Sequence, residues 1–333
     1  MDMAYWLPVA WFAVIAFGVF MYVVLDGFVL GLGILVPLAR DEAQRDLMMN
    51  TAAPIWDGNE TWLVLGGAGL LAAFPAAYAT ILPALYLPVL MMLVALVFRG
   101  VAFEFRFKAQ RTRWIWGWAF AAGSICAAFW QGVILGALVQ GLPSADEGAW
   151  AWLRPFALMT GVALVAGYAL LGATWLILKT TDDVQRLARR CARPLVIAVA
   201  GFMCLVSAGL PLLSSRVMER WFTSGNFWWL APVPLLALAT VWALWRVVVR
   251  QGRDARAFLL ALGLFALAYG GLLLGLWPYL VPPVLTIWDA AAPPSSQTFM
   301  LVGVVSLLPL ILGYTAWSYY VFRGKLKPGQ GYH

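Results

Sequence analysis

The feature of the sequence that most constrains the fold is a series of apolar runs, each long enough to cross a lipid bilayer. A transmembrane helix needs about 20 predominantly apolar residues to span a ~30 Å hydrocarbon core. The chain has nine such runs, near residues 7–38, 52–74, 79–99, 114–140, 156–178, 194–213, 226–248, 256–277 and 297–322. Because 63% of the 333 residues are hydrophobic and 11% are charged, a soluble domain is excluded. We therefore expect an all-α polytopic membrane protein with about nine transmembrane helices, residues 1–333 forming a single transmembrane domain.

The basic residues predict the orientation of these helices. Residues 7–38 are long for one span and short for two, so we expect one long or tilted helix there. If the connecting segments then alternate between two sides, all but three of the 22 Lys and Arg residues fall on one side. The three exceptions are Arg154, Arg216 and Arg220. Since cytoplasmic loops are enriched in Lys and Arg, the pattern predicts a periplasmic N-terminus and a cytoplasmic C-terminus, and it argues against nucleic-acid binding.

Small residues mark places where helices can approach closely. They are Gly27, Gly31 and Gly33 in the first run and Gly66, Gly67 and Gly69 in the second. Gly172 and Ala173 in the fifth run faintly repeat Asp26-Gly27 of the first. This weak repeat favours two four-helix bundles plus one peripheral helix.

Carboxylates lie at the cytoplasmic ends of the first two runs. Ionisable residues inside a membrane span are costly and usually face a bundle interior, a partner or a water path. Counted from Leu7, Asp26 lies roughly 28 Å along the first helix, close to the inner edge of the hydrocarbon core. Asp57 and Glu60 fall in the first turns of the second helix, which starts from the same side. We expect these three acids to lie close together and to suit proton transfer.

The third run adds further charges at this edge. We expect its helix to end at Arg99, with Glu104 and Arg106 just beyond. A structural alternative exists for each group, because acids near a helix N-terminus offset the macrodipole and Arg99 can neutralise Asp57 as a simple pair. The structural role is favoured for Glu60 and Glu104 and a functional role for Asp26. Asp57 suits both.

The residues that would carry redox or hydrolytic chemistry are missing. The chain has one histidine, His333, and its three cysteines have no metal-binding spacing. No nucleotide-binding or nucleophile motif occurs. We expect no metal or haem ligands and no catalytic residue in this chain. Asp289, in a Pro-rich outer loop, is expected to cap the last helix or to contact another subunit.

Eight blocks of sequence, in order along nearly the whole chain, carry a family resemblance. They are Leu25-Asp26-Gly27-Phe28; Ala53-Pro54-Ile55-Trp56-Asp57-Gly58-Asn59 with Trp62; Phe74-Pro75-Ala76-Ala77-Tyr78-Ala79; Phe98-Arg99-Gly100-Val101-Ala102-Phe103-Glu104-Phe105-Arg106; Gln140-Gly141; Gly172-Ala173-Thr174; Thr286-Ile287-Trp288-Asp289-Ala290; and Tyr314-Thr315-Ala316-Trp317. Together they resemble subunit II of the cytochrome bd-type quinol oxidases. The short chain and short outer loops are most similar to the cyanide-insensitive branch.

The resemblance implies a partner, a reaction and a location. The partner is a haem-bearing subunit I with two b-type haems, one d-type haem and the quinol site. The complex oxidises quinol and reduces dioxygen to water, taking protons from the cytoplasm across a bacterial inner membrane. This chain is then its non-haem subunit. A structural quinone, held by some members, and a small single-span accessory subunit are open expectations.

The resemblance also assigns roles to residues. Asp57 matches the acid at the cytoplasmic mouth of a proposed proton path, with Asp26 and Arg99 alongside. Trp62 matches a residue that lines a proposed hydrophobic oxygen route. Some relatives carry a second acid where this chain has Val29, which puts the role of Asp26 in doubt. Some relatives have Gln at the position of Glu60, which adds a carboxylate to the path here.

Two other functions remain open from the residues alone. A proton-coupled transporter would place its acids near the bilayer midplane, often at broken helices. A structural scaffold would hold all its acids in ion pairs. The clustering of acids at one edge of the membrane favours the oxidase subunit over the transporter.

Overall fold

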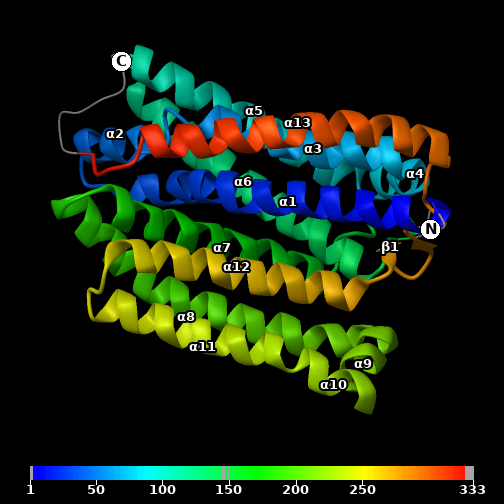
Figure 1. Cartoon of the computed structure of the whole chain (residues 1–333). Coiled ribbons are helices and arrows are strands. Elements are labelled where there is room, and N and C mark those ends of the chain that lie inside the picture. Colours follow the sequence, from blue (N-terminus) through cyan, green and yellow to red (C-terminus); the bar gives the residue numbers. More distant parts are fainter. Residues whose placement is uncertain (1–2, 144–146, 149, 327–333) are drawn as a thin grey trace.

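The computed structural model describes residues 3–143, 147–148 and 150–326, so Lys327 and His333 lie outside the described residues. The helices and strands are α1 (Met3–Leu35), the 3-10 helix η1 (Val36–Leu38), α2 (Glu42–Asn50), α3 (Trp56–Ala73), α4 (Pro75–Ala84), α5 (Tyr86–Lys108), α6 (Arg113–Gln140), α7 (Pro155–Lys179), α8 (Asp182–Leu213), α9 (Ser215–Phe222), α10 (Ser224–Leu230), α11 (Pro232–Val249), α12 (Asp254–Leu276), β1 (Tyr279–Val281), β2 (Leu285–Thr286) and α13 (Pro294–Val321). The long helices lie side by side, and α1 begins at the end of the bundle opposite to the one where α13 ends (Figure 1).

The prediction of a polytopic helical membrane protein is confirmed. Among the described residues, eight helices are long and apolar enough to cross a membrane, and the number becomes nine when α3 and α4 count as one bent span. The first run forms one long helix, as expected. The only strands in the described residues, β1 and β2, form a small antiparallel pair, which the sequence did not indicate.

The predicted third span, 79–99, is wrong at both ends. α3 stops at Ala73, and α4 turns away from it by 118°. Pro75 causes the break, because proline cannot donate the next hydrogen bond of a helix ladder. The span that follows is α5, which starts at Tyr86 and continues to Lys108. Arg99 therefore lies within this helix, nine residues before its end.

The two ends of the bundle differ in chemistry. One end, called the basic end here, comprises the segments 36–55, 106–113, 179–190, 250–254 and 322–326. Hydrogen bonds tie these segments together, such as those from Lys325 Nζ to Asp254 Oδ2 (2.5 Å) and to the Thr180 carbonyl (3.0 Å). At the opposite end, the indole Nε1 of Trp11 donates to the Gln297 carbonyl (3.1 Å). The chain thus closes both ends with contacts between segments far apart in sequence.

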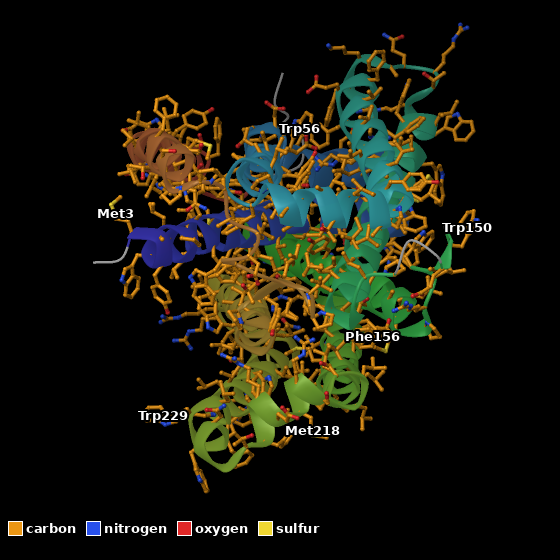
Figure 2. All side chains as sticks on the ribbon, turned by 90° about the vertical axis from the view of Figure 1, so that its right-hand side faces the viewer. Met3, Trp56, Trp150, Phe156, Met218 and Trp229 are labelled. Carbon is orange, nitrogen blue, oxygen red and sulfur yellow. The ribbon has the colours of Figure 1, made fainter. Side chains whose placement is uncertain are left out.

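α1 and α7 occupy the centre of the molecule. In each, 67% of the most apolar stretch is buried, against 0% for α13 at the periphery, and Figure 2 shows α13 and the α8–α11 group projecting from this centre. The two central helices cross at glycines. A Cβ on Gly31 would lie 1.9 Å from the Tyr168 carbonyl oxygen, and one on Gly172 would lie 2.4 Å from the Gly31 carbonyl carbon. The close approach predicted for the Gly27–Gly31 face is confirmed. The arrangement as two four-helix bundles stays a prediction.

Candidate functional site

The site is built around one buried cation that contacts two acids. Nη2 of Arg99 in α5 lies 2.5 Å and 2.7 Å from the carboxylate oxygens of Asp26 in α1. The same nitrogen lies 2.9 Å from Oε1 of Glu60 in α3, within ion-pair distance but without hydrogen-bond alignment. The side chains of Arg99 and Asp26 are 0% exposed, whereas that of Glu60 is 32% exposed. We call Asp26, Glu60 and Arg99 the core cluster.

The core cluster agrees with the sequence prediction in only part of its membership, because Arg106 pairs with acids of α2 and Glu104 is exposed. The expectation that Asp26, Glu60 and Arg99 converge is confirmed. The structural alternative in which Arg99 neutralises Asp57 is not observed, because the described ion pairs of Arg99 are with Asp26 and Glu60. α5 continues past Arg99, so its guanidinium lies buried inside the bundle, whereas Asp57 is exposed. Asp57 remains close enough for its charge to act on Glu60.

Hydrogen bonds fix the first turn of α3 beside the core cluster. Nδ2 of Asn59 donates to the Leu25 carbonyl (3.0 Å), and the Tyr319 hydroxyl donates to Oδ1 of Asn59 (3.1 Å). The amide of Asn59 therefore links α3 to both α1 and α13. This link sets the rotation of α3, so that Glu60 points toward Arg99 and Asp57 points outward.

A chain of polar side chains continues from Asp26 into the core. The Tyr22 hydroxyl, one turn away on α1, is hydrogen-bonded to Asp26. Nε2 of Gln131 donates to this hydroxyl (2.7 Å), and the Tyr168 hydroxyl donates to Oε1 of Gln131 (2.8 Å). The Asp26 carboxylate thus interacts with Tyr22 as well as with Arg99. It ends at Tyr168, which is fully buried.

Exposure decreases along the acids of the site. Asp57 is exposed, Glu60 is partly exposed and Asp26 is buried. Asp57 also belongs to an exposed stripe of α3. This α3 stripe consists of Asp57, Gly58, Thr61, Val64, Gly67, Ala68 and Leu71. A Cβ added at Gly58 or Gly67 would meet nothing within 4 Å. The acids thus lead from an open helix face to a closed interior.

A second group of charges, which we call the end cluster, lies at the basic end. It consists of Glu42, Arg45 and Asp46 of α2 with Arg106 and Arg113. Nη2 of the buried Arg106 contacts Glu42 Oε2 (2.5 Å) and Asp46 Oδ1 (3.0 Å). Partial burial works against ionisation of Glu42, but its hydrogen bonds to Arg106 and Arg45 outweigh this effect and lower its pKa. The end cluster fastens α2 across the end of α5.

Trp62 is almost fully buried and lies outside the exposed α3 stripe. Its ring meets Phe17 of α1 edge to face, with 5.9 Å between ring centroids. Its indole Nε1 has no hydrogen-bond partner among the described residues. Trp62 thus fills the contact between α1 and α3 with an apolar surface.

Three further predictions can be compared with the structure. Val29 is fully buried in the apolar core, so an acid at this position would lie within packed side chains. Glu104 is exposed on α5 and lies outside both clusters. Asp289 does not cap α13: its Oδ2 accepts from the backbone N–H (3.1 Å) and hydroxyl of Thr286, and the hydroxyl, together with the N–H, lowers the pKa of Asp289. It closes a local turn.

The described residues contain no group of three or more His, Cys, Asp or Glu side chains that could hold a metal ion. The donors present do not suit a buried haem or copper either, since these need His, Met or Cys ligands facing inward. In the core cluster, one guanidinium forms ion pairs with two carboxylates. These groups balance one another's charge inside the bundle.

Sequence reasoning missed several members of the site. It did not single out Tyr22, Gln131, Tyr168 or Tyr319, because a tyrosine or glutamine in an apolar run has many ordinary roles. The one available signal was spacing, since Tyr22 and Asp26 share a helix face at i,i+4. The acids of α2 were also missed, because the sequence of a short polar helix between two spans resembles that of a loop.

Comparisons with known proteins place this geometry in a family. The family model for cytochrome bd terminal oxidase subunit II matches residues 7–322. Cytochrome bd ubiquinol oxidase subunit 2 of Bacillus subtilis (strain 168) is 30% identical over 95% of this chain and 96% of its own length. Cytochrome bd-I ubiquinol oxidase subunit 2 of Escherichia coli (strain K12) is 31% identical over 92% of this chain and 91% of its own.

A solved structure supports the same fold. The bd oxidase from Geobacillus thermodenitrificans contains a chain that matches with a TM-score of 0.80 at 17% identity, covering 95% of this chain and 98% of that one. The family match spans both clusters and all the long helices. The chain belongs to the cytochrome bd terminal oxidase subunit II family.

Proposed function

We propose that this chain is the non-haem subunit of a quinol:oxygen oxidoreductase in a bacterial inner membrane. It pairs with a haem-bearing subunit I, and the complex oxidises quinol and reduces dioxygen to water. The two b-type haems and the d-type haem are assigned to the partner, as the resemblance to the family implies. A structural quinone, a small accessory subunit and the cyanide-insensitive assignment stay predictions.

The chain also provides a path for protons, which the reduction of dioxygen to water consumes. The observation that carries this proposal is the charge balance of the core cluster. One buried guanidinium lies between two carboxylates, so the cluster has one acid more than its cation can neutralise. A carboxyl group that lacks a neutralising cation in a low-dielectric setting is more stable when it binds a proton. Asp57, on the exposed α3 stripe, passes protons to Glu60, and Glu60 shares the cluster with Asp26 and Arg99.

Unpaired polar atoms around the core cluster support a hydrated path. Nε and Nη1 of Arg99 are buried and have no hydrogen-bond partner among the described residues. Buried donors of this kind are normally satisfied, and internal water molecules would be suitable acceptors for them. A few such waters would connect the acids, as in other membrane proton relays.

The α3 stripe faces subunit I. Its glycines leave room for a second helix to approach closely, and the acids of the site open toward this side. The basic end lies in the cytoplasm, following the positive-inside rule. Protons then enter from the cytoplasm and are delivered toward the haem-bearing partner.

Trp62 lines the hydrophobic oxygen route of the family. Its buried, apolar contact with Phe17 suits the passage of a small apolar molecule between α1 and α3 better than it suits water. A smaller residue at Trp62 would widen this contact. Dioxygen affinity, measured as the Michaelis constant for oxygen, is the quantity that would change.

Asp57→Asn tests the proton path, because it keeps the size of the side chain and removes its ionisable proton. With the complex assembled, we expect oxygen reduction and proton uptake to slow by about tenfold, equivalent to ~1.4 kcal/mol in the barrier. Asp183→Asn is the matched control, since Asp183 is an exposed acid at the basic end, paired with Arg186. Assembly is checked by the haem spectrum. Unchanged turnover in Asp57→Asn would leave the chain a structural scaffold.

A further inference from the structure

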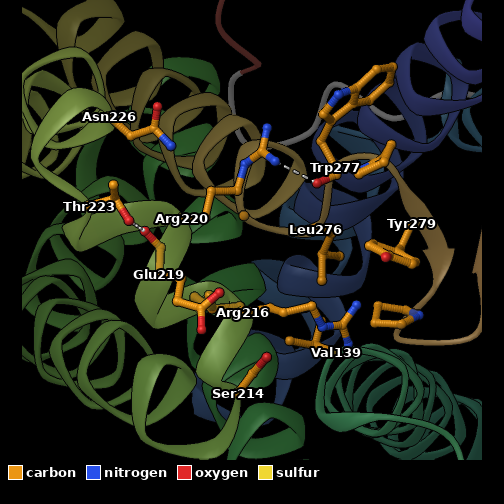
Figure 3. Close-up of a pocket in the computed structure, with 14 residues that line it drawn as sticks. Val139, Ser214, Arg216, Glu219, Arg220, Thr223, Asn226, Leu276, Trp277 and Tyr279 are labelled. Atoms are coloured by element: carbon orange, nitrogen blue, oxygen red, sulfur yellow. Dashed lines mark hydrogen bonds between the residues drawn. The ribbon is translucent and has the colours of Figure 1, made fainter.

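A cavity of about 310 Å³ lies at the end opposite the basic end, between α9 and the segment that joins α12 to β1 (Figure 3). Its volume is at the lower limit of the ~300–1,000 Å³ typical of small-molecule sites. None of the residues of the two clusters lines it. It is therefore separate from the proposed proton path.

Two arginines of α9 line this cavity. Arg216 and Arg220 are one helical turn apart, so both side chains lie on the same face of the helix. Nη1 of Arg220 donates to the Trp277 carbonyl (2.9 Å), and the guanidinium of Arg216 lies 4.6 Å from the centroid of the Tyr279 ring. These contacts hold both guanidinium groups at the wall of the cavity, as Figure 3 shows.

The arginines are not neutralised within the described part of the chain. No described carboxylate is within salt-bridge distance of either, whereas Arg154, the third basic residue expected at this end, is 2.7 Å from Glu147. Glu219 also lines the cavity. Two arginines and one glutamate leave one net positive charge, which matches the single negative charge of a phosphodiester.

The surroundings of the cavity are those of a membrane surface. Trp228 and Trp229 of α10 are 77% and 85% exposed, and Leu212 at the end of α8 is 80% exposed. Figure 2 shows Met218 and Trp229 at the outer tip of the molecule. Exposed tryptophans are typical of the level of the lipid headgroups. These apolar side chains belong to the helices on either side of α9 and would favour a lipid over a soluble anion.

We infer that this cavity binds the phosphodiester headgroup of an anionic phospholipid. Guanidinium groups bind phosphate oxygens through paired, charge-assisted hydrogen bonds. The headgroup would contact Arg216 and Arg220, and the acyl chains would leave along the exposed apolar side chains of α8 and α10. The bound lipid would fasten the short helices α9 and α10 to the rest of the bundle.

The test is lipid retention by the full chain purified with its partner subunit. The complex is exchanged into detergent with phosphatidylglycerol or phosphatidylcholine, and bound lipid is measured by native mass spectrometry. We expect retention of phosphatidylglycerol to fall about tenfold in Arg216→Gln and more in Arg216→Gln/Arg220→Gln, because each change removes a charge-assisted bond. Glu219→Gln should increase retention, since it removes the repelling charge. Arg154→Gln is the matched control and should change nothing.

Four results would overturn the inference. The first is equal retention of the two lipids, and the second is retention that does not change in the arginine variants. The third is displacement by millimolar glycerol phosphate, which would indicate a soluble anion. The fourth is weaker binding of subunit I in Arg216→Gln with no change in lipid, which would assign the arginines to a protein contact. If Arg216→Gln/Arg220→Gln fails to assemble, Arg216→Gln and Glu219→Gln still move retention in opposite directions.

Discussion

The core cluster and the end cluster use the same residue types but differ in charge balance. Arg99 and Arg106 lie seven residues apart on one face of α5, about 10 Å along the helix, and the side chains of both are 0% exposed. The core cluster has one arginine and two acids. The end cluster has three arginines and two acids, and all but Arg106 are partly exposed.

Under the proposed function, this difference separates a proton-conducting cluster from a structural one. In the end cluster each acid already has at least two cations within ion-pair distance, so there is no reason for it to bind a proton. In the core cluster a second acid shares a cation that Asp26 already occupies. Both clusters contain a buried arginine, so the proposed proton site is distinguished by its surplus of acids over cations.

The largest expected effect is that of removing the core cation. Arg99→Leu leaves Asp26 buried without a neutralising cation, and breaking a buried ion pair in this way costs ~3–5 kcal/mol. Arg113→Leu in the end cluster removes a 35% exposed partner and should cost about 1 kcal/mol or less. The yield and thermal midpoint of the assembled complex measure both. Adding Asp26→Leu to Arg99→Leu should restore part of the loss, and equal losses in the two single variants would remove the distinction between the clusters.

Turnover gives the next largest contrast. Glu60→Gln keeps the shape of the side chain but removes the surplus acid, so oxygen reduction should slow by about tenfold while the complex still assembles. Glu42→Gln makes the same chemical change in the end cluster and should leave turnover unchanged. Steady-state oxygen consumption, normalised to haem content, compares them. Slowing in Glu42→Gln but not in Glu60→Gln would reverse the assignment.

The sequence predicted the members of the core cluster better than its geometry. Apolar runs and charge asymmetry gave the helical membrane fold, because the bilayer permits few alternatives. The pairing could not be predicted, since it depends on where α5 begins and ends. Pro75 could have indicated the break after α3. The 118° turn and the short α4 nevertheless depend on packing between segments that hydropathy does not describe.

The polar chain from Tyr22 to Tyr168 was beyond sequence reasoning for the same reason. Its residues come from three helices, and the packing of α1, α6 and α7 against one another brings them together. The sequence predicted that the glycines at the crossing of α1 with α7 form a contact face, but it did not predict which helix they contact. Patterns within one helix are local, whereas a site between helices is a product of their packing.

A smaller effect tests the side to which the core cluster opens. Gly67→Leu adds a side chain to the α3 stripe where nothing in this chain is within reach, so the chain itself should remain stable. If subunit I lies against the stripe, its co-purification should fall several-fold, since ~1 kcal/mol changes a binding constant about fivefold. Gly201→Leu on α8, also an open position, is the matched control. Equal recovery of the partner in both variants would place subunit I elsewhere.

The smallest effect concerns the pH dependence of the end cluster. Arg106 and Arg45 lower the pKa of Glu42, so the folded state favours the ionised carboxylate. The stability gained is present above the ordinary pKa of 4.5 and is lost as the pH falls through the lower folded value. Because the Glu42 side chain is 41% exposed, the gain is at most ~1 kcal/mol. The thermal midpoint of Glu42→Gln should therefore lie slightly below that of the unchanged protein at pH 7, and the two should converge below pH 4.5. Glu104→Gln, an exposed acid outside both clusters, should show no such convergence. A difference for Glu42→Gln that persists at low pH would mean that the residue stabilises α2 by packing instead of charge.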